Sequence, residues 1–226
     1  PPDSVFATAV AGVATFTGAF IETAGTFDVR FTAPGLTDAL SNSFVVAPAG
    51  AARLVVTVQP AAAIAGSAIP AVTVVARDAF DNPVTAFTGP IEAVVDSGPV
   101  LGWSMGGTQT INAVLGSATF SDLTLDRASD YKLRFRSAGL DSAVTTTFTL
   151  SPAAAAVLSI LEGDGQTGTA STALADSIGA RITDAFGNPI AGATVNWTVQ
   201  AGGGSLAIAS GLTGVDGVAR NAWTLG

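Results

Sequence analysis

The fold is indicated most directly by six consecutive residues in the middle of the chain, Tyr131-Lys132-Leu133-Arg134-Phe135-Arg136. Apolar and basic residues alternate without interruption, so Tyr131, Leu133 and Phe135 would share one face of a β-strand and the basic side chains the other. We therefore predict a half-buried strand whose apolar face belongs to a hydrophobic core. Residues 118–125 and 194–199 are predicted to form strands of the same kind.

The same pattern lies 104 residues earlier, from Thr26 to Phe31. It belongs to a longer internal repeat, because residues 9–54 align with residues 113–158 at one constant offset (113 − 9 = 104) and without a gap. Eighteen of the 46 aligned positions are identical. A period of about one small domain predicts a tandem array of one module.

Composition and turn signals indicate the architecture of that module. The chain is rich in Ala, Val and Thr and contains 26 Gly and 11 Pro, which favours many short strands joined by turns. About seven short strands per repeat are typical of an immunoglobulin-like sandwich. The predicted fold class is all-β, with tandem immunoglobulin-like β-sandwich modules joined by short connectors.

A second internal match, between residues 78–83 and 184–189, has an offset of 106 and relates the middle of the chain to its end. We place module boundaries near Pro48 and Pro152, because a final strand precedes each proline and a new strand follows. Residues 152–158 have high helix propensity, but their counterpart contains Gly50, so both segments are predicted to be stiff connectors. The predicted domains are residues 1–48, a partial module (its carboxy-terminal half), residues 49–152, a complete module, and residues 153–226, a partial module (its amino-terminal part).

Charge and composition exclude several classes of function. Seventeen acidic residues against nine basic ones give a net charge of −8, so no basic stripe is available for nucleic acid. The chain contains neither histidine nor cysteine, which removes the commonest general base and all thiol chemistry. No run of about 18 apolar residues is present, so we expect no membrane insertion within this segment. We predict that the chain is not an enzyme.

The repeated motif Asp78-Ala79-Phe80-Asp81-Asn82-Pro83 has two possible interpretations. It is typical of a tight turn, because Asp and Asn bond their own backbone and proline fixes the exit. The alternative is a calcium site formed by Asp78, Asp81 and Asn82, with Asp184 and Asn188 in the second copy. Calcium takes about six to eight oxygen ligands, and Gly187 removes one carboxylate from the second copy. We favour the turn and predict no cofactor.

The remaining candidate sites are on the surface or in loops. Trp103 and Met105, in a loop flanked by glycines, are candidate interaction residues, or belong to a loop folded over the end of the sandwich. Asn196 begins a glycosylation sequon on an outward face. Three acidic residues are expected to be solvated surface carboxylates: Asp122, Asp126 and Asp130. The glycine triplet Gly202-Gly203-Gly204 is expected to form a hairpin loop.

Two stretches resemble a known family. Residues 116–126 together with residues 131–140 resemble the Ig-like repeats of large bacterial surface and secreted proteins. Residues 184–197 and 217–226 are similar to the invasin and intimin type of bacterial Ig-like domain. The resemblance implies an extracellular or cell-surface location and a structural, non-enzymatic segment of a filament or adhesin shaft. A ligand-binding or carbohydrate-binding adhesin module, and accessory domains of a secreted hydrolase, remain alternatives.

The two partial modules suggest the partners of the chain. Under the 104-residue offset, Pro1 corresponds to Met105, which is late in a module, and residue 226 falls before the last strands of the third module. Either these residues are part of a longer array, or the amino-terminal half-module of one copy completes the carboxy-terminal half-module of another. The expected partners are therefore neighbouring Ig-like modules or copies of the chain in a head-to-tail fibre.

Overall fold

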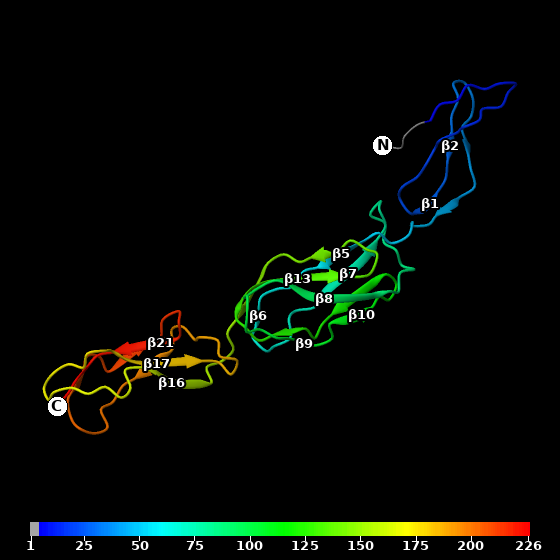
Figure 1. Cartoon of the computed structure of the whole chain (residues 1–226). Coiled ribbons are helices and arrows are strands. Elements are labelled where there is room, and N and C mark those ends of the chain that lie inside the picture. Colours follow the sequence, from blue (N-terminus) through cyan, green and yellow to red (C-terminus); the bar gives the residue numbers. More distant parts are fainter. Residues whose placement is uncertain (1–4) are drawn as a thin grey trace.

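The protein is an elongated row of three bodies of β-strands (Figure 1), seen in a computed structural model that describes residues 5–226. Pro1 lies outside the described residues. We name the bodies the first unit (residues 5–48), the central unit (residues 49–152) and the third unit (residues 153–226), using the division proposed from the sequence. No helix occurs between residues 5 and 226, and the predicted all-β class is confirmed.

The central unit contains two facing sheets. One sheet has the strand order β11-β7-β5, with bounds Ser117–Phe120, Val72–Arg77 and Arg53–Val58. The other has the order β10-β8-β13-β15-β6, with bounds Thr110–Asn112, Pro90–Ser97, Ser129–Arg136, Phe148–Ser151 and Ala63–Ile64. A short strand, β14 (Ala143–Val144), also pairs with β13. All of these pairs are antiparallel except β15 with β6.

This strand order is that of an immunoglobulin domain. Lettered in chain order, β5, β7 and β11 take the places of strands A, B and E, and β8, β13 and β15 take the places of C, F and G. These two sets form the opposing sheets of an immunoglobulin sandwich. The topology of the central unit therefore confirms the predicted immunoglobulin-like fold.

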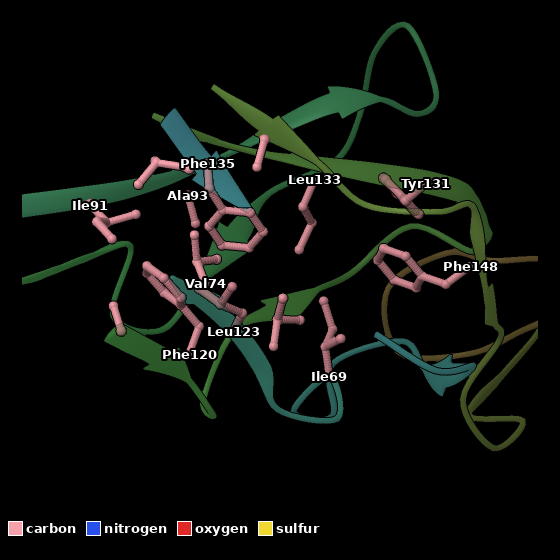
Figure 2. Close-up of a cluster of buried hydrophobic side chains, with 14 of the residues drawn as sticks. Ile69, Val74, Ile91, Ala93, Phe120, Leu123, Tyr131, Leu133, Phe135 and Phe148 are labelled. Atoms are coloured by element: carbon pink, nitrogen blue, oxygen red, sulfur yellow. The ribbon is translucent and has the colours of Figure 1, made fainter. Parts of the chain in front are cut away.

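The core of the central unit lies between the sheets (Figure 2). Tyr131, Leu133 and Phe135 of β13 are fully buried, as the alternation in the sequence predicted. The two aromatic rings of β13 pack on aromatic residues from other strands. The ring centroids of Phe135 and Phe120 are 5.0 Å apart, and those of Tyr131 and Phe148 are 6.1 Å apart. Burial of such rings contributes about 1.5–3 kcal/mol each, so β13 is a main source of this unit's stability.

Tyr131 has a second role at the start of β13. Its hydroxyl donates a hydrogen bond of 2.7 Å to the backbone oxygen of Arg127, four residues upstream. This arrangement is the tyrosine corner of immunoglobulin-like domains, in which the tyrosine at the start of strand F bonds back to the preceding loop. Burial raises the pKa of the Tyr131 hydroxyl, which keeps it a hydrogen-bond donor.

Three predicted strands are shorter or more broken than the sequence suggested. Residues 118–125 were expected to form one strand, but they divide into β11 and β12 (Thr124–Leu125), and β12 pairs with β9 (Met105–Gly106). The cause is the spacing of the buried residues, because Phe120 and Leu123 both face the core and a three-residue interval breaks the period of two. The other two cases are residues 26–31, which divide into β1 (Gly25–Phe27) and β2 (Arg30–Phe31), and residues 194–199, where β18 covers Thr194–Asn196.

The outer units contain fewer buried residues. In the first unit β1 pairs with β4 (Phe44–Val46) and β2 with β3 (Ala39–Leu40), and none of residues 5–48 is buried. In the third unit β16, β17 and β21 form one sheet, and β18 with β20 and β19 with β22 form two pairs. The sheet strands are β16 (Val157–Glu162), β17 (Ile178–Thr183) and β21 (Val218–Asn221). The other strands besides β18 are β20 (Ser210–Leu212), β19 (Ser205–Leu206) and β22 (Trp223–Thr224). Ala180, Val195 and Ala219 form a small core there.

Candidate functional site

The repeated Asp/Asn motif lies at the junctions between units. In the first copy the chain turns sharply after β7, and Asp78 Oδ1 accepts hydrogen bonds from the backbone nitrogens of Phe80 (2.9 Å) and Asn82 (2.8 Å). The third residue after Asp78 has a left-handed backbone, with φ of 74° at Asp81 and 81° at its counterpart Gly187. Aspartate and glycine both tolerate this region, which explains why either residue serves.

The first junction joins three segments through this turn. Asp78 Oδ2 accepts hydrogen bonds from the connector nitrogen of Ala49 and from Asn82 Nδ2, each 2.9 Å long. The Asn82 amide then reaches the first unit, where Oδ1 accepts from Ala24 N at 2.8 Å and Nδ2 donates to Glu22 O at 2.7 Å. One buried amide therefore binds two backbone groups of the preceding unit.

The second junction repeats every one of these contacts. Asp184 Oδ1 accepts from the backbone nitrogens of Phe186 (2.9 Å) and Asn188 (2.8 Å). Asp184 Oδ2 accepts from the connector nitrogen of Ala153 (2.9 Å) and from Asn188 Nδ2 (2.8 Å). The Asn188 amide contacts the central unit, accepting from Ala128 N and donating to Asp126 O, both at 2.8 Å.

We call the set of six hydrogen bonds found at each junction the joint network. The same six atom pairs occur at both junctions, and their residues are related by the two repeat offsets: Ala24, Glu22 and Ala49 correspond to Ala128, Asp126 and Ala153 at 104, and Asp78 and Asn82 to Asp184 and Asn188 at 106. Because a satisfied side-chain amide has both donor and acceptor directions fixed, the network defines how each unit meets the next.

Burial makes the joint network energetically important. The exposed fractions of Asp78 and Asn82 are 0% and 8%, and those of Asp184 and Asn188 are 1% and 0%. A buried polar group that loses its partner costs about 1–3 kcal/mol, and a charged one more. The network is therefore stable only when both units supply their hydrogen-bonding groups.

The two buried carboxylates remain ionised without a cation as partner. Burial raises the pKa of Asp78, but hydrogen bonds from the Asn82 side chain and from the backbone of Asn82, Ala49 and Phe80 outweigh burial and hold this pKa below its ordinary value. The same balance, with Asn188, Ala153 and Phe186 as donors, lowers the pKa of Asp184. Hydrogen bonds to a carboxylate favour its charged form.

An apolar contact accompanies the network at the second junction. The ring of Phe186, in the turn of the third unit, lies against Gly66 of the central unit, where a Cβ atom would come within 2.3 Å of the ring. Gly66 has φ of 77°, in the left-handed region. A side chain at this position would displace the ring, so glycine permits the close approach of the two units.

The calcium candidates have other partners in this structure. The Asp78 and Asp184 oxygens accept N–H groups, as described above, and the Asp81 carboxylate faces the other way, within 2.7 Å of Arg53 Nη2 and 3.2 Å of Arg77 Nη1. Across the part of the chain that is described, no three His, Cys, Asp or Glu residues are arranged to hold a metal ion. The motif's side chains are thus positioned as hydrogen-bond acceptors and as surface ion pairs.

The interaction candidates are in different environments. Met105 lies in β9 and packs against the central core, whereas Trp103 lies in the preceding loop and is 37% exposed. The Asp126 carboxylate accepts hydrogen bonds from the backbone and hydroxyl of Ser104. Since the Asp126 carbonyl belongs to the joint network, this loop borders the second junction.

The other predicted surface residues are also accounted for. Asp122 and Asp130, expected to be simply solvated, accept hydrogen bonds from Thr108 (2.7 Å) and Thr149 (2.6 Å). Asn196 is exposed. Sequence reasoning missed the contact of Asn82 and Asn188 with the preceding unit. The signal available was the recurrence of the motif at a nearly fixed distance after each connector.

Comparisons with known proteins give the following results. No family model and no curated protein matches the chain. A solved structure of the D0-D1 domains of intimin is 17% identical with a TM-score of 0.33, covering 77% of this chain and 85% of that one. Domains 4–9 of the surface layer protein SbsC are 13% identical (TM-score 0.35), covering 89% of this chain and 31% of that one.

A β-glycosidase from Bacteroides vulgatus is 16% identical with a TM-score of 0.37, and the match covers 56% of this chain but 17% of the glycosidase. Within residues 5–226 no helix could cross a membrane. The strand order makes the chain an all-β protein with an immunoglobulin-like β-sandwich at its centre, and the solved structures to which it is similar include the intimin domains named above.

Proposed function

We propose that this chain is a structural, non-enzymatic segment of a bacterial extracellular filament or adhesin shaft. Its function is to hold Ig-like modules in a row at a fixed relative orientation. The observation that carries the proposal is the recurrence of the joint network, atom for atom, at both junctions. A cell-surface setting belongs to this proposal and follows the sequence resemblance to repeats of surface proteins.

The arrangement of donors and acceptors supports a rigid joint rather than a flexible tether. Each connector nitrogen is bound by an aspartate, Ala49 by Asp78 and Ala153 by Asp184, and each asparagine bridges to a backbone segment of the preceding unit. Flexible linkers are rich in Gly and Ser and leave their backbone to water. Here the connector backbone is held by buried side chains, so adjacent units would move together.

The proposal is tested by measuring the distance between two units. Since the chain has no cysteine, spin labels can be placed on cysteines introduced at Ser97 in the central unit and Ser159 in the third, both exposed. A narrow distance distribution is expected, and Asn188→Ala should broaden it. Asn196→Ala, an exposed asparagine away from the junction, is the matched control and should leave it narrow. A broad distribution in the unaltered chain would refute the rigid joint.

A second candidate function is ligand binding by an adhesin module. It is favoured by the exposed loop before β9, where Val100 and Leu101 are 93% and 82% exposed and lie beside Trp103. Exposed apolar residues grouped in one loop mark contact sites in many proteins. The test is a glycan and protein binding screen with Trp103→Ala, which would lose binding if this loop contacts a ligand.

A further inference from the structure

The third unit has an open strand edge. Its strand β18 pairs with β20 through Thr194 and Leu212, as β8 of the central unit pairs with β10. On its other edge β8 pairs with β13, the strand that carries the main core residues. Within residues 5–226, no strand pairs with that edge of β18. An unpaired edge beside an apolar face is a template for another strand.

An apolar groove lies next to the open edge. It has a volume of about 370 Å³, and its lining is mostly apolar and includes two tryptophans: Ile178, Trp197, Thr198, Val199, Gln200, Ala201, Leu206 and Trp223. The indole nitrogens of Trp197 and Trp223 are buried and have no hydrogen-bond partner among the described residues. Hydrogen bonds relate β18 to β8 at an offset of 104, not 106: Ala193 O accepts from Thr213 N as Gly89 O accepts from Ala113 N, and Trp197 N donates to Ala209 O as Ala93 N donates to Gln109 O. The counterparts of Trp197 and Val199 are therefore Ala93 and Val95, which pair with Phe135 and Leu133.

The first unit carries the matching strand. Its β1–β4 correspond to β13–β15 at an offset of 104 and keep the same pairing: Thr26 faces Val45 as Asp130 faces Thr149. Arg30 likewise faces Leu40 as Arg134 faces Val144. The residues equivalent to Leu133 and Phe135 are Val29 and Phe31, and they are 39% and 41% exposed. Among the described residues β1 pairs only with β4 and β2 only with β3, so the edge that β13 offers to β8 is open on β1 and β2 there.

We propose that the open edge of β18, together with residues 197–201 that follow it, binds the β1–β2 edge of a second copy of this chain, in the antiparallel register that β8 and β13 adopt. Leu133 faces Val95 and Phe135 faces Ala93 in the central unit. Applying the offset gives Val29 facing Val199 (133 − 104 = 29, 95 + 104 = 199) and Phe31 facing Trp197. The apolar side chains of the first unit would then fill the groove and complete a sandwich.

A glycine supports this register. Tyr131 packs over Gly98, where a Cβ atom would come within 2.6 Å of the ring. The counterpart of Gly98 at an offset of 104 is Gly202, and the space that its Cβ would occupy has no atom within 4 Å. The first-unit equivalent of Tyr131 is Phe27, so its ring would take the position over Gly202 that is open in the third unit.

The two open edges lie at opposite ends of the row (Figure 1). One copy therefore cannot pair its own edges, and each added copy leaves one edge of each kind free. A heterologous contact of this type propagates into a filament. The inference goes beyond the proposed function, because it depends on strand register alone and holds whether or not the joints are rigid.

Disulfide trapping tests the register directly. Facing residues in an antiparallel pair have Cα atoms about 4.5–5.5 Å apart, within the range of a disulfide. The double variant Val29→Cys with Val199→Cys should give, under mild oxidation, a ladder of covalent multiples of the 22.3 kDa chain. The control replaces Val199→Cys with Asn196→Cys, because Asn196 is exposed and is not among the residues that line the groove. A ladder of equal strength in the control would overturn the register.

Self-association of the unaltered chain provides a second measurement, whose main readout does not depend on any variant. Sedimentation velocity over a wide range of concentrations should show species that grow with concentration, and Val29→Asp, which places a charge in the groove, should return the chain to a monomer. An unaltered chain that stays monomeric at every concentration would refute the proposal. Filaments that persist in Val29→Asp would assign the contact to another surface.

Discussion

Asn188 binds Ala128 across the junction of two units, its Oδ1 accepting the alanine's backbone N–H at 2.8 Å. The orientation of the Asn188 amide is set within its own turn, because its Nδ2 donates to Asp184 Oδ2 at 2.8 Å. The aspartate therefore acts on the neighbouring unit through the asparagine. Asn82 and Ala24 have the same relationship at the first junction, so the module carries its own means of orienting the module before it.

Replacing Asn188 by alanine is expected to open the second junction while both units stay folded. Asp126 O and Ala128 N would lose their partner, at a cost of about 1–3 kcal/mol for each buried group that water does not reach. Hydrogen exchange is the measurement, and the amide of Ala128 should exchange faster. Asn196→Ala is the control and should leave that amide protected. Unchanged protection in Asn188→Ala would mean that packing alone maintains the junction.

The joint network is expected to weaken in acid. The pKa values of Asp78 and Asp184 are lowered from 3.8 in the folded chain, so the folded state binds protons less readily than the unfolded one. The stabilisation is present above pH 3.8 and is lost as the pH falls through the lowered folded values. Spin-label distances between Ser97 and Ser159 should broaden over that range. A distribution that stays narrow after both carboxylates are protonated would contradict the prediction.

The sequence predicted most of the central unit because its two signals agree. The alternation at residues 131–136 and the 104-residue repeat both depend on side chains in regular strands, where period and burial are directly linked. The division between β11 and β12 could not be predicted from alternation, since Phe120 and Leu123 are both buried while the chain leaves one sheet for another.

The joint network could not be predicted from the sequence, for a different reason. The sequence shows that residues 78–83 and 184–189 are alike, and turn chemistry explains their Asp and Asn. The partners of Asn82 are backbone atoms of Glu22 and Ala24, about 60 residues away (82 − 22 = 60). Backbone groups carry no residue-specific signal, so the contact becomes visible only when the units are placed together.

Removal of the Tyr131 hydroxyl is expected to destabilise the central unit modestly. Tyr131→Phe keeps the ring in the core and deletes the 2.7 Å hydrogen bond to Arg127 O, a loss of about 1 kcal/mol. Urea unfolding followed by Trp103 fluorescence, with Trp197→Phe and Trp223→Phe in the background, measures this unit. Tyr131→Ala, which also removes the buried ring, should cost about 3–5 kcal/mol. An unchanged free energy of unfolding in Tyr131→Phe would contradict the tyrosine corner.

Calcium is expected to leave the thermal unfolding of the chain unchanged. The Asp78 and Asp184 oxygens already accept four N–H groups each, and Asp81 is paired with Arg53 and Arg77. A ligand that binds the folded state raises its stability by RT ln(1 + [L]/Kd). Calorimetry with excess calcium and with a chelator is the measurement. A midpoint that rises with calcium concentration, and no longer does so in Asp81→Asn, would establish the calcium site.

The contact between Phe186 and Gly66 is expected to influence the angle between the units more than their stability. In Gly66→Ala the new Cβ would lie 2.3 Å from the ring, and the ring, at the end of a rotatable side chain, would move away. Gly139→Ala is the matched control, because Gly66 and Gly139 both have φ of 77° and the Cβ at Gly139 would meet no atom within 4 Å. Both variants carry the same backbone strain, so their unfolding midpoints should fall by similar amounts. Only Gly66→Ala should shift the distance between Ser97 and Ser159, and a shift of the same size in Gly139→Ala would show that strain, not the ring, sets the angle.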